Sequence, residues 1–175
     1  MTTDDFTEAE KTSYLGMAYD LAHNSPDLST QLGAVLMNKR SHFYSVIGIG
    51  WNTLPRGVKT SDERLSRPTK YLYTEHAERN AIFDAARRGH ATEGSTMFCP
   101  WFACADCGRA IIQSGVKKVI GHKAMFDGTP DRWKDSIAEA FVMFGEAGVQ
   151  TEIFDGYINA VRPLRFNEEL WTPSS

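Results

Sequence analysis

The second half of the sequence alternates between extended and helical patterns, and this alternation limits the fold more than any other feature. Between residues 74 and 154 the apolar spacing predicts, in order, helix 74–88, strand 96–99, helix 104–114, strand 116–121, helix 131–146 and strand 149–154. Strand and helix repeats of this kind form parallel strands with helices packed on the sheet. We therefore expect an α/β fold.

The first half adds one helix and a hairpin. Thr7 and Glu10 fit a capping box that begins a helix over 8–24, and two apolar runs over 32–38 and 44–51, separated by the polar turn Lys39-Arg40-Ser41, predict antiparallel strands. The following loop, 52–73, has no sustained periodicity and carries five basic against two acidic residues. The prediction is a single domain over 1–175, with a three-layer α/β/α core at about 8–154, a mixed five-stranded sheet and an irregular tail over 155–175.

Composition excludes several classes of protein. The net charge of −3 gives no attraction to polynucleotides or acidic lipids, and no run of about 18 apolar residues indicates a membrane span. The first fifteen residues carry acids where a signal peptide would carry bases, so we expect a cytoplasmic protein. Three cysteines, an odd number, argue against a disulfide framework.

Two short motifs, each at the start of a predicted helix, carry the chemistry. His76-Ala77-Glu78 opens one helix and Cys104-Ala105-Asp106-Cys107 opens the next, at the edge of parallel strands where open α/β sheets place ligands. Two thiolates and one imidazole suit one tetrahedral Zn²⁺ ion per subunit, with the fourth position left for water. Taken alone, the first motif could be a polar helix turn, and the second a structural zinc site, a redox pair or buried thiols.

With this pair of motifs, the chain resembles the cytidine and deoxycytidylate deaminase superfamily over about Leu15–Phe154. It is more narrowly similar to deoxycytidylate deaminases, including those of phages, in four segments: Pro26–Ala34, Gly50–Gly57, His76–Ile82 and Trp101–Cys107. The resemblance implies a cytidine-deaminase-like fold and hydrolytic deamination of dCMP to dUMP and ammonia, which supplies dUMP for thymidylate synthesis.

The resemblance also implies roles for individual residues. His76, Cys104 and Cys107 would bind zinc, which activates water for attack on C4 of the cytosine, and Glu78 would carry the proton to N3 and then to the amino group. Residues i and i+2 of a regular helix point about 200° apart, so this role for Glu78 requires a site that meets the helix end-on.

Substrate contacts follow from the resemblance and from position. By resemblance, Asn52 contacts the deoxyribose or phosphate end of the substrate and the Ala77 backbone contacts the pyrimidine. Trp101 precedes the cysteines and could wall the base pocket, although packing at a strand end explains it as well. Arg132 and Arg56 offer cations to a phosphate, although basic loop residues are commonly only solvated.

Regulation is a further implication of the resemblance: a homo-oligomer, commonly a hexamer, activated by dCTP and inhibited by dTTP, with Asn52 and Arg56 at the effector site. Trp51 and Thr53 depart from the usual tyrosine and glycine of the loop after the second strand. A mobile substrate lid without an effector is the alternative for that loop.

Other functions stay open at this point. The chain could deaminate another cytosine or guanine nucleoside or nucleotide, or a base in tRNA, and the acidic net charge argues against tRNA. It could also be a zinc-stabilised interaction module without activity. Glu78 argues against a module, because a structural zinc site needs no acid beside the metal.

Overall fold

A mixed five-stranded sheet forms the centre of the protein, which the computed structural model describes over residues 6–40, 43–159 and 161–173. The strands lie in the order β2-β1-β3-β4-β5, with bounds β1 Gly33–Arg40, β2 Phe43–Trp51, β3 Thr96–Phe98, β4 Lys118–His122 and β5 Gln150–Phe154. Strand β1 is antiparallel to both β2 and β3, whereas β3, β4 and β5 are parallel. The predicted mixed sheet is confirmed.

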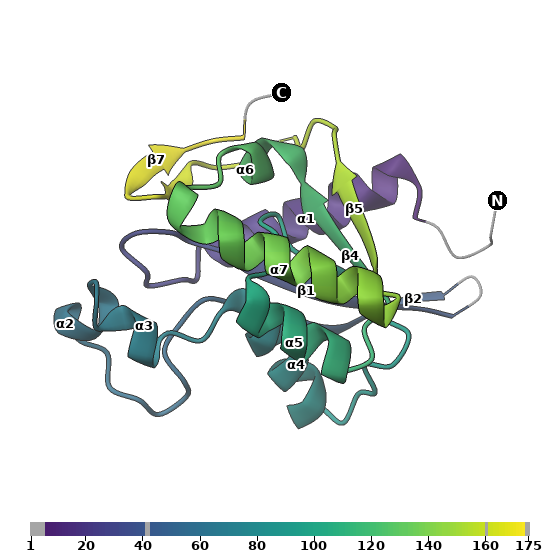
Figure 1. Ribbon diagram of the computed structural model, residues 1–175, viewed down its shortest axis with the longest axis horizontal. Coiled ribbons are helices and arrows are strands. Elements are labelled where there is room, and N and C mark those ends of the chain that lie inside the picture. The colour runs from purple at the N-terminus through teal and green to yellow at the C-terminus, as the bar shows by residue number, and fades with distance from the viewer. Residues whose placement is uncertain (1–5, 41–42, 160, 174–175) are drawn as a thin grey trace.

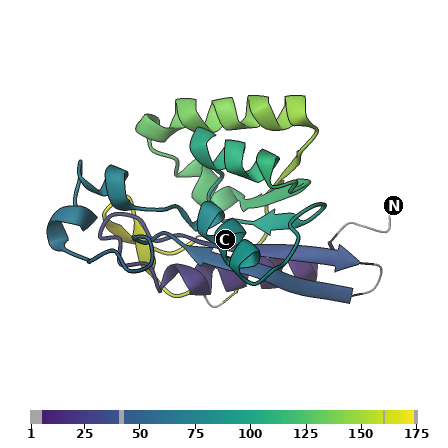
Figure 2. The same cartoon turned by 90° about the horizontal axis from the view of Figure 1, so that it is seen from below.

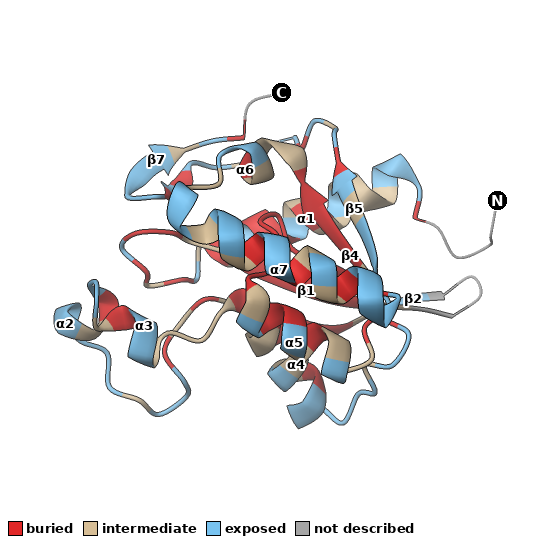
Figure 3. Cartoon of the chain, viewed as in Figure 1, coloured by how far each residue is buried: buried red, intermediate tan, exposed pale blue. Residues whose placement is uncertain are grey.

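Helices cover both faces of this sheet. Their bounds are α1 Glu8–Ala22, α2 Asp62–Leu65, α3 Lys70–Tyr73, α4 Ala77–Arg87, α5 Ala105–Gln113, α6 Lys123–Asp127 and α7 Asp131–Ala147. Helix α1, which begins at the predicted capping box, lies on one face, and α4, α5 and α7 lie on the other (Figures 1 and 2). Buried residues gather on the central strands and on the helix faces turned toward them (Figure 3). No helix in the described part of the chain is long and apolar enough to cross a membrane.

Glycines in β2 let helix α4 approach the sheet closely. A Cβ atom at Gly50 would collide with the carbonyl oxygen of Ala77, the first residue of α4, and one at Gly48 would collide with the carbonyl oxygen of Ala81. The absence of side chains at these two positions therefore fixes the distance between β2 and the start of α4.

We expect Gly50→Ala to lower the free energy of unfolding by about 1–3 kcal/mol, because the backbone of α4 must move to admit a methyl group. Gly145→Ala is the matched control, because a Cβ there meets nothing within 4 Å and lies inside helix α7, where alanine is favoured over glycine. Urea unfolding of both variants measures the difference. Equal stability of the two would mean that the sheet and α4 are not in tight contact at Gly50.

Two helices begin later than the residue spacing predicts. Helix α4 begins at Ala77, so His76 is its N-cap in extended conformation, with φ −76° and ψ 158°. Helix α5 begins at Ala105, with Cys104 as its N-cap, also extended. Both predicted ligand motifs therefore straddle a helix start instead of lying wholly within the first turn.

Short elements in the connections differ from the prediction as well. Helices α2 and α3 lie inside the 52–73 loop, and α6 lies in the connection before α7. Lys39 and Arg40, predicted as turn residues, belong to β1, and the remaining turn residue lies outside the described part of the chain. Elements of four or five residues are too short for apolar periodicity to indicate them.

The prediction of an irregular tail is wrong. Residues Leu164–Phe166 and Glu169–Trp171 form the antiparallel hairpin β6–β7, whose residues Leu164 and Phe166 are buried. The backbone N–H of Gln31 donates to the carbonyl oxygen of Arg165 at 2.8 Å. Strands of three residues carry little periodic signal, and this hairpin depends on contacts with residues more than 100 positions away in the sequence.

Candidate active site

The two motifs meet at one edge of the sheet. Strands β2 and β3 are both antiparallel to β1, so their carboxyl ends lie at the same edge. Strand β2 leads to Asn52, and β3 leads through Trp101 to Cys104, while the N-terminus of α4 brings His76 to the same place. The predicted meeting of both helix starts is confirmed.

The ligand atoms of His76, Cys104 and Cys107 all lie within 4.8 Å of one another. His76 Nδ1 lies 3.6 Å from Cys104 Sγ and 3.5 Å from Cys107 Sγ. A tetrahedral Zn²⁺ ion with bonds of about 2.0 Å to nitrogen and 2.3 Å to sulfur separates such atoms by about 3.5 Å. The three residues therefore fit a zinc ion, and in the described part of the chain no fourth ligand joins the set.

The two thiols have opposite pKa shifts. A hydrogen bond from Cys107 outweighs burial and, together with His76, lowers the pKa of Cys104 to about 4. The same interaction and burial raise the pKa of Cys107. The lowered pKa favours the thiolate form of Cys104, and the thiolate is the form of cysteine that binds a divalent cation.

Glu78 lies beside the ligands, and one oxygen of its carboxyl group has no hydrogen-bond partner among the described residues. Its side chain is 3% exposed, and this oxygen, Oε2, is buried. Burial raises the pKa of this carboxyl above its ordinary value, and the nearby His76 offsets only part of that increase. Because His76 is the N-cap and Glu78 the second residue of α4, the site meets the helix end-on, as the predicted role of Glu78 requires.

A cavity of about 640 Å³, counting the part open to solvent, joins these groups to the rest of the site. His76, Glu78 and Cys104 line it together with aromatic and charged side chains. Glu78 is buried, whereas Arg67 and Arg132 are exposed, so the arginines mark the side that opens to solvent.

Of three predicted substrate contacts, Trp101 and Asn52 line this cavity and Ala77 does not. Trp101 lines it and donates its indole N–H to Thr129 Oγ1 at 3.0 Å. Ala77 is fully buried between the lining residues His76 and Glu78. Asn52 also lines the cavity, but its Nδ2 donates to Thr30 O and its Oδ1 accepts from the Leu32 amide, each at 2.7 Å. The contact of Asn52 with substrate stays a prediction.

The two predicted phosphate arginines lie in different cavities. Arg132 lines the cavity that holds Glu78. Arg56 lines a second cavity of about 1380 Å³, again counting its open part, which lies along β2 and α4 and is also lined by Trp51 and Thr53. Arg56 is therefore not placed to hold the phosphate of a substrate bound at Glu78.

Sequence reasoning missed several residues of the site. Thr74 lines the cavity with a buried Oγ1 that has no partner among the described residues, and Trp133 of α7 lies edge-on to the His76 ring at 5.9 Å between centroids. Lys70 lines it too, and its Nζ contacts both carboxylate oxygens of Asp27 at 2.8 and 2.7 Å. The position of Lys70 within a locally basic loop was the only available signal.

Cys99 is not part of the ligand set. It is fully buried after β3, and its thiol donates to the carbonyl oxygen of Trp101 at 3.0 Å. The sequence motif already assigned the ligand role to the other two cysteines, and the structure agrees.

The sequence is similar to those of known deaminases. The model of the cytidine and deoxycytidylate deaminase zinc-binding region matches residues 8–123. Human deoxycytidylate deaminase is 32% identical over 154 residues, covering 83% of this chain and 79% of that protein. An uncharacterized deaminase of Aliivibrio fischeri is 37% identical over 126 residues, covering 72% and 80% of the two chains.

A solved structure gives the same result for the fold. The dCMP deaminase of the cyanophage S-TIM5, in complex with dCMP and dUMP, superposes with a TM-score of 0.68 at 26% identity, over 86% of this chain and 100% of the phage chain. The region matched by the family model spans well over half of the sequence and includes all three ligands and Glu78. The chain therefore belongs to the cytidine and deoxycytidylate deaminase family and is a zinc-dependent deaminase.

Proposed function

We propose that this enzyme hydrolyses dCMP to dUMP and ammonia and so supplies dUMP for thymidylate synthesis. The observation that carries the proposal is a single cavity that is lined by His76, Cys104 and Glu78 on its buried side and by the cations Arg67 and Arg132 on its open side. A base and a phosphate at opposite ends of one small molecule match this distribution. The human relative and the cyanophage protein, named as deaminases of the same nucleotide, support it.

His76, Cys104 and Cys107 would hold the zinc ion, which when bound supplies water of lowered pKa at neutral pH. Glu78 would carry one proton of that water to N3 of the cytosine, where it stays, and would then carry the second proton, from the hydroxyl group added at C4, to the departing amino group. Water supplies the new oxygen at C4, and the amino group leaves as ammonia, so the reaction needs no other reactant. The unpartnered Oε2 of Glu78 is consistent with a group that exchanges protons with substrate.

Other residues would bind and orient the nucleotide. Trp101 would wall the base pocket, the backbone at Ala77 would contact the pyrimidine, and Asn52 would lie at the deoxyribose or phosphate end. Arg132 would bind the 5′-phosphate from the start of α7. Each of these residues, apart from the buried Ala77, lines the cavity directly.

Release of ammonia, measured side by side for dCMP, dCTP, deoxycytidine, cytidine and guanine, tests the assignment. Each reaction is run with the zinc-loaded protein and after chelation. The proposal expects the highest kcat/KM for dCMP and loss of activity on chelation. A higher kcat/KM for guanine or for either nucleoside would reassign the substrate.

We also propose that the enzyme is a homo-oligomer, a hexamer by resemblance, regulated by dCTP as activator and dTTP as inhibitor, at a site that includes Arg56. Asn52, which was predicted to share that site, lines the cavity that holds Glu78 and not the cavity that holds Arg56, so the effector site proposed here does not include it. The second cavity, which contains Arg56, supports this idea. Thr53 and Glu75 exchange backbone hydrogen bonds of 3.0 and 2.8 Å, and Glu75 directly precedes the ligand His76. A nucleotide bound at the loop after β2 would therefore act on a segment that is connected to the ligand set.

Titration of dCTP and dTTP against subsaturating dCMP is expected to shift the rate in opposite directions for the two triphosphates. Effectors that bind a separate site change the shape of the substrate curve, whereas ligands of the active site only raise the apparent KM. Simple competition by both triphosphates would contradict the effector site and would leave the deaminase assignment intact.

A further inference from the structure

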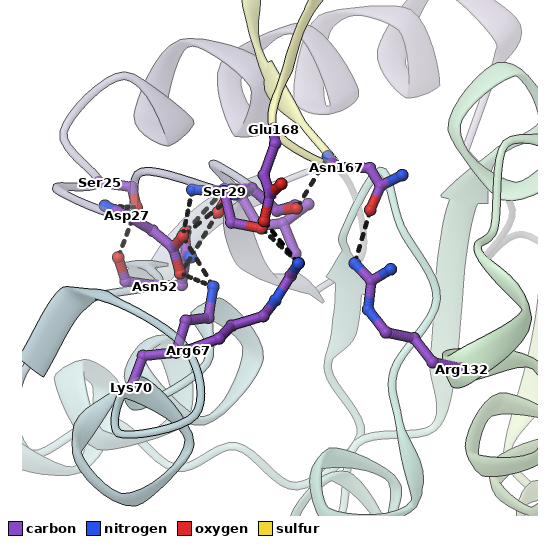
Figure 4. Close-up of polar contacts among 11 residues, drawn as sticks. Ser25, Asp27, Ser29, Asn52, Arg67, Lys70, Arg132, Asn167 and Glu168 are labelled. Atoms are coloured by element: carbon purple, nitrogen blue, oxygen red, sulfur yellow. Dashed lines mark hydrogen bonds and ion pairs between the residues drawn. The ribbon is translucent and has the colours of Figure 1, made fainter.

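The turn of the C-terminal hairpin contacts both arginines of the catalytic cavity. Arg132, at the start of α7, donates from Nη2 to Asn167 Oδ1 at 2.7 Å. Arg67, in the segment before α3, donates from Nη1 to Glu168 Oε1 at 2.6 Å, and its Nη2 donates to Ser29 Oγ. Figure 4 shows the two arginines reaching this turn from separate parts of the chain.

The turn itself is fixed in place by contacts that do not involve the arginines. The backbone N–H of Asn167 donates to Thr30 Oγ1 at 3.1 Å, and the backbone N–H of Glu168 donates to Ser29 O at 2.7 Å. The Phe166 ring meets the Trp101 ring edge-on at 5.3 Å between centroids. Because backbone and ring contacts hold the turn, the backbone positions from which Asn167 and Glu168 reach the arginines are fixed.

The charges around the open side of the cavity are unequally compensated. Lys70 pairs with Asp27, and both side chains are less than a tenth exposed, so this pair is neutral. Arg67 pairs with the carboxylate of Glu168. The hydrogen-bond partner of Arg132 in the described structure is the uncharged amide of Asn167. The local positive charge that a phosphate would meet therefore resides mainly on Arg132, held by a neutral group.

We propose that Asn167 and Glu168 set the preference of this enzyme for a nucleotide over a nucleoside, and that they do so in opposite directions. Asn167 orients the Arg132 guanidinium toward the 5′-phosphate and leaves the charge of the guanidinium unchanged. Because Arg132 is already ordered, its side chain loses less conformational freedom when the substrate binds. Glu168 offsets the charge of Arg67 and so weakens the attraction for the same phosphate. The inference rests on the proposed function, because it needs a substrate that carries a phosphate.

Two substitutions separate this role from a structural one. Asn167 has φ 53°, so Asn167→Gly removes the amide while keeping a backbone conformation that glycine adopts readily. Glu168→Gln removes one charge at constant size and at the same backbone position. Glu169→Gln is the matched control, because Glu169 is exposed on the same hairpin and its substitution removes the same charge.

The measured quantity is the ratio of kcat/KM for dCMP to kcat/KM for deoxycytidine. Asn167→Gly is expected to lower this ratio about 10-fold, chiefly through KM for dCMP, because an oriented charge-assisted contact is weakened. Glu168→Gln is expected to raise it about 3-fold, because one partly exposed opposing charge is removed. Glu169→Gln should leave it unchanged. Dissociation constants of dUMP and deoxyuridine, measured by calorimetry, should change in the same sense without turnover.

The outcomes separate the two levels of inference. Failure of the wild-type enzyme to prefer dCMP over deoxycytidine would overturn the proposed function. If the wild type prefers dCMP but both hairpin variants lose activity equally on the two substrates, the turn is only structural and the positioning role is wrong. Ratios that fall with both variants would contradict the opposite roles of Asn167 and Glu168.

Discussion

Glu78→Gln is expected to lower kcat for the deamination by at least ~10²-fold while zinc stays bound at one ion per chain. General acid and base catalysis contributes about 10²–10⁴-fold, and an amide cannot carry the proton. Glutamine has the shape of glutamate, and residue 78 is not among the three ligands, so the metal set stays intact. The loss should therefore be a loss of chemistry and not of metal.

Glu78→Gln should lose activity without losing stability. The Glu78 carboxylate is buried, and one oxygen lacks a hydrogen-bond partner among the described residues, an arrangement that costs free energy in the folded state. Removing the charge should therefore leave the Tm of the chelated, metal-free protein unchanged or raise it. Glu139→Gln, on the exposed side of α7, is the control and should retain wild-type kcat. A Glu78→Gln variant with zinc bound and near-normal turnover would remove Glu78 from the mechanism.

The ligand set was predictable from the sequence because its geometry is local. Cys104 and Cys107 are three residues apart across one helix start, so their approach depends on a single turn of backbone. His76 needed only the alternation of strands and helices, which brings the two helix starts to one edge of the sheet. The end-on approach to Glu78 was not predictable, because it depends on the extended conformation of the N-cap residue His76.

The phosphate side of the cavity was less accessible to sequence reasoning. Arg132 was identified by its charge and position, but its partner Asn167 lies 35 residues later in a hairpin that was predicted to be irregular. The Asp27–Lys70 pair joins residues 43 positions apart. Such contacts leave no periodic pattern in the sequence, because they depend on how helices, strands and loops pack in the folded protein. Chemistry that depends on one helix start was therefore predictable, whereas chemistry assembled from distant loops was not.

Cys104→Ala and Cys107→Ala are each expected to lose stoichiometric zinc and all measurable deamination. Two of the three ligands remain in either variant, and they are too few to fill a protein zinc site. Cys99→Ala is the matched control, since Cys99 is equally buried but donates its thiol to a backbone carbonyl and is not in the ligand set. It should retain zinc and activity, with a lower Tm from the space left by the sulfur.

The same variants test how far the metal stabilises the fold. A ligand present at 100 times its dissociation constant adds about 2.7 kcal/mol to the stability of the folded state. Chelation should therefore lower the Tm of the wild type and of Cys99→Ala, and should leave the Tm of Cys104→Ala unchanged, because no metal remains to be removed. Mass spectrometry measures the zinc content per chain, and thermal melts with and without chelator measure the change in Tm. Full zinc content in Cys104→Ala or Cys107→Ala would exclude that cysteine as a ligand, since the remaining side chains would then suffice to hold the ion.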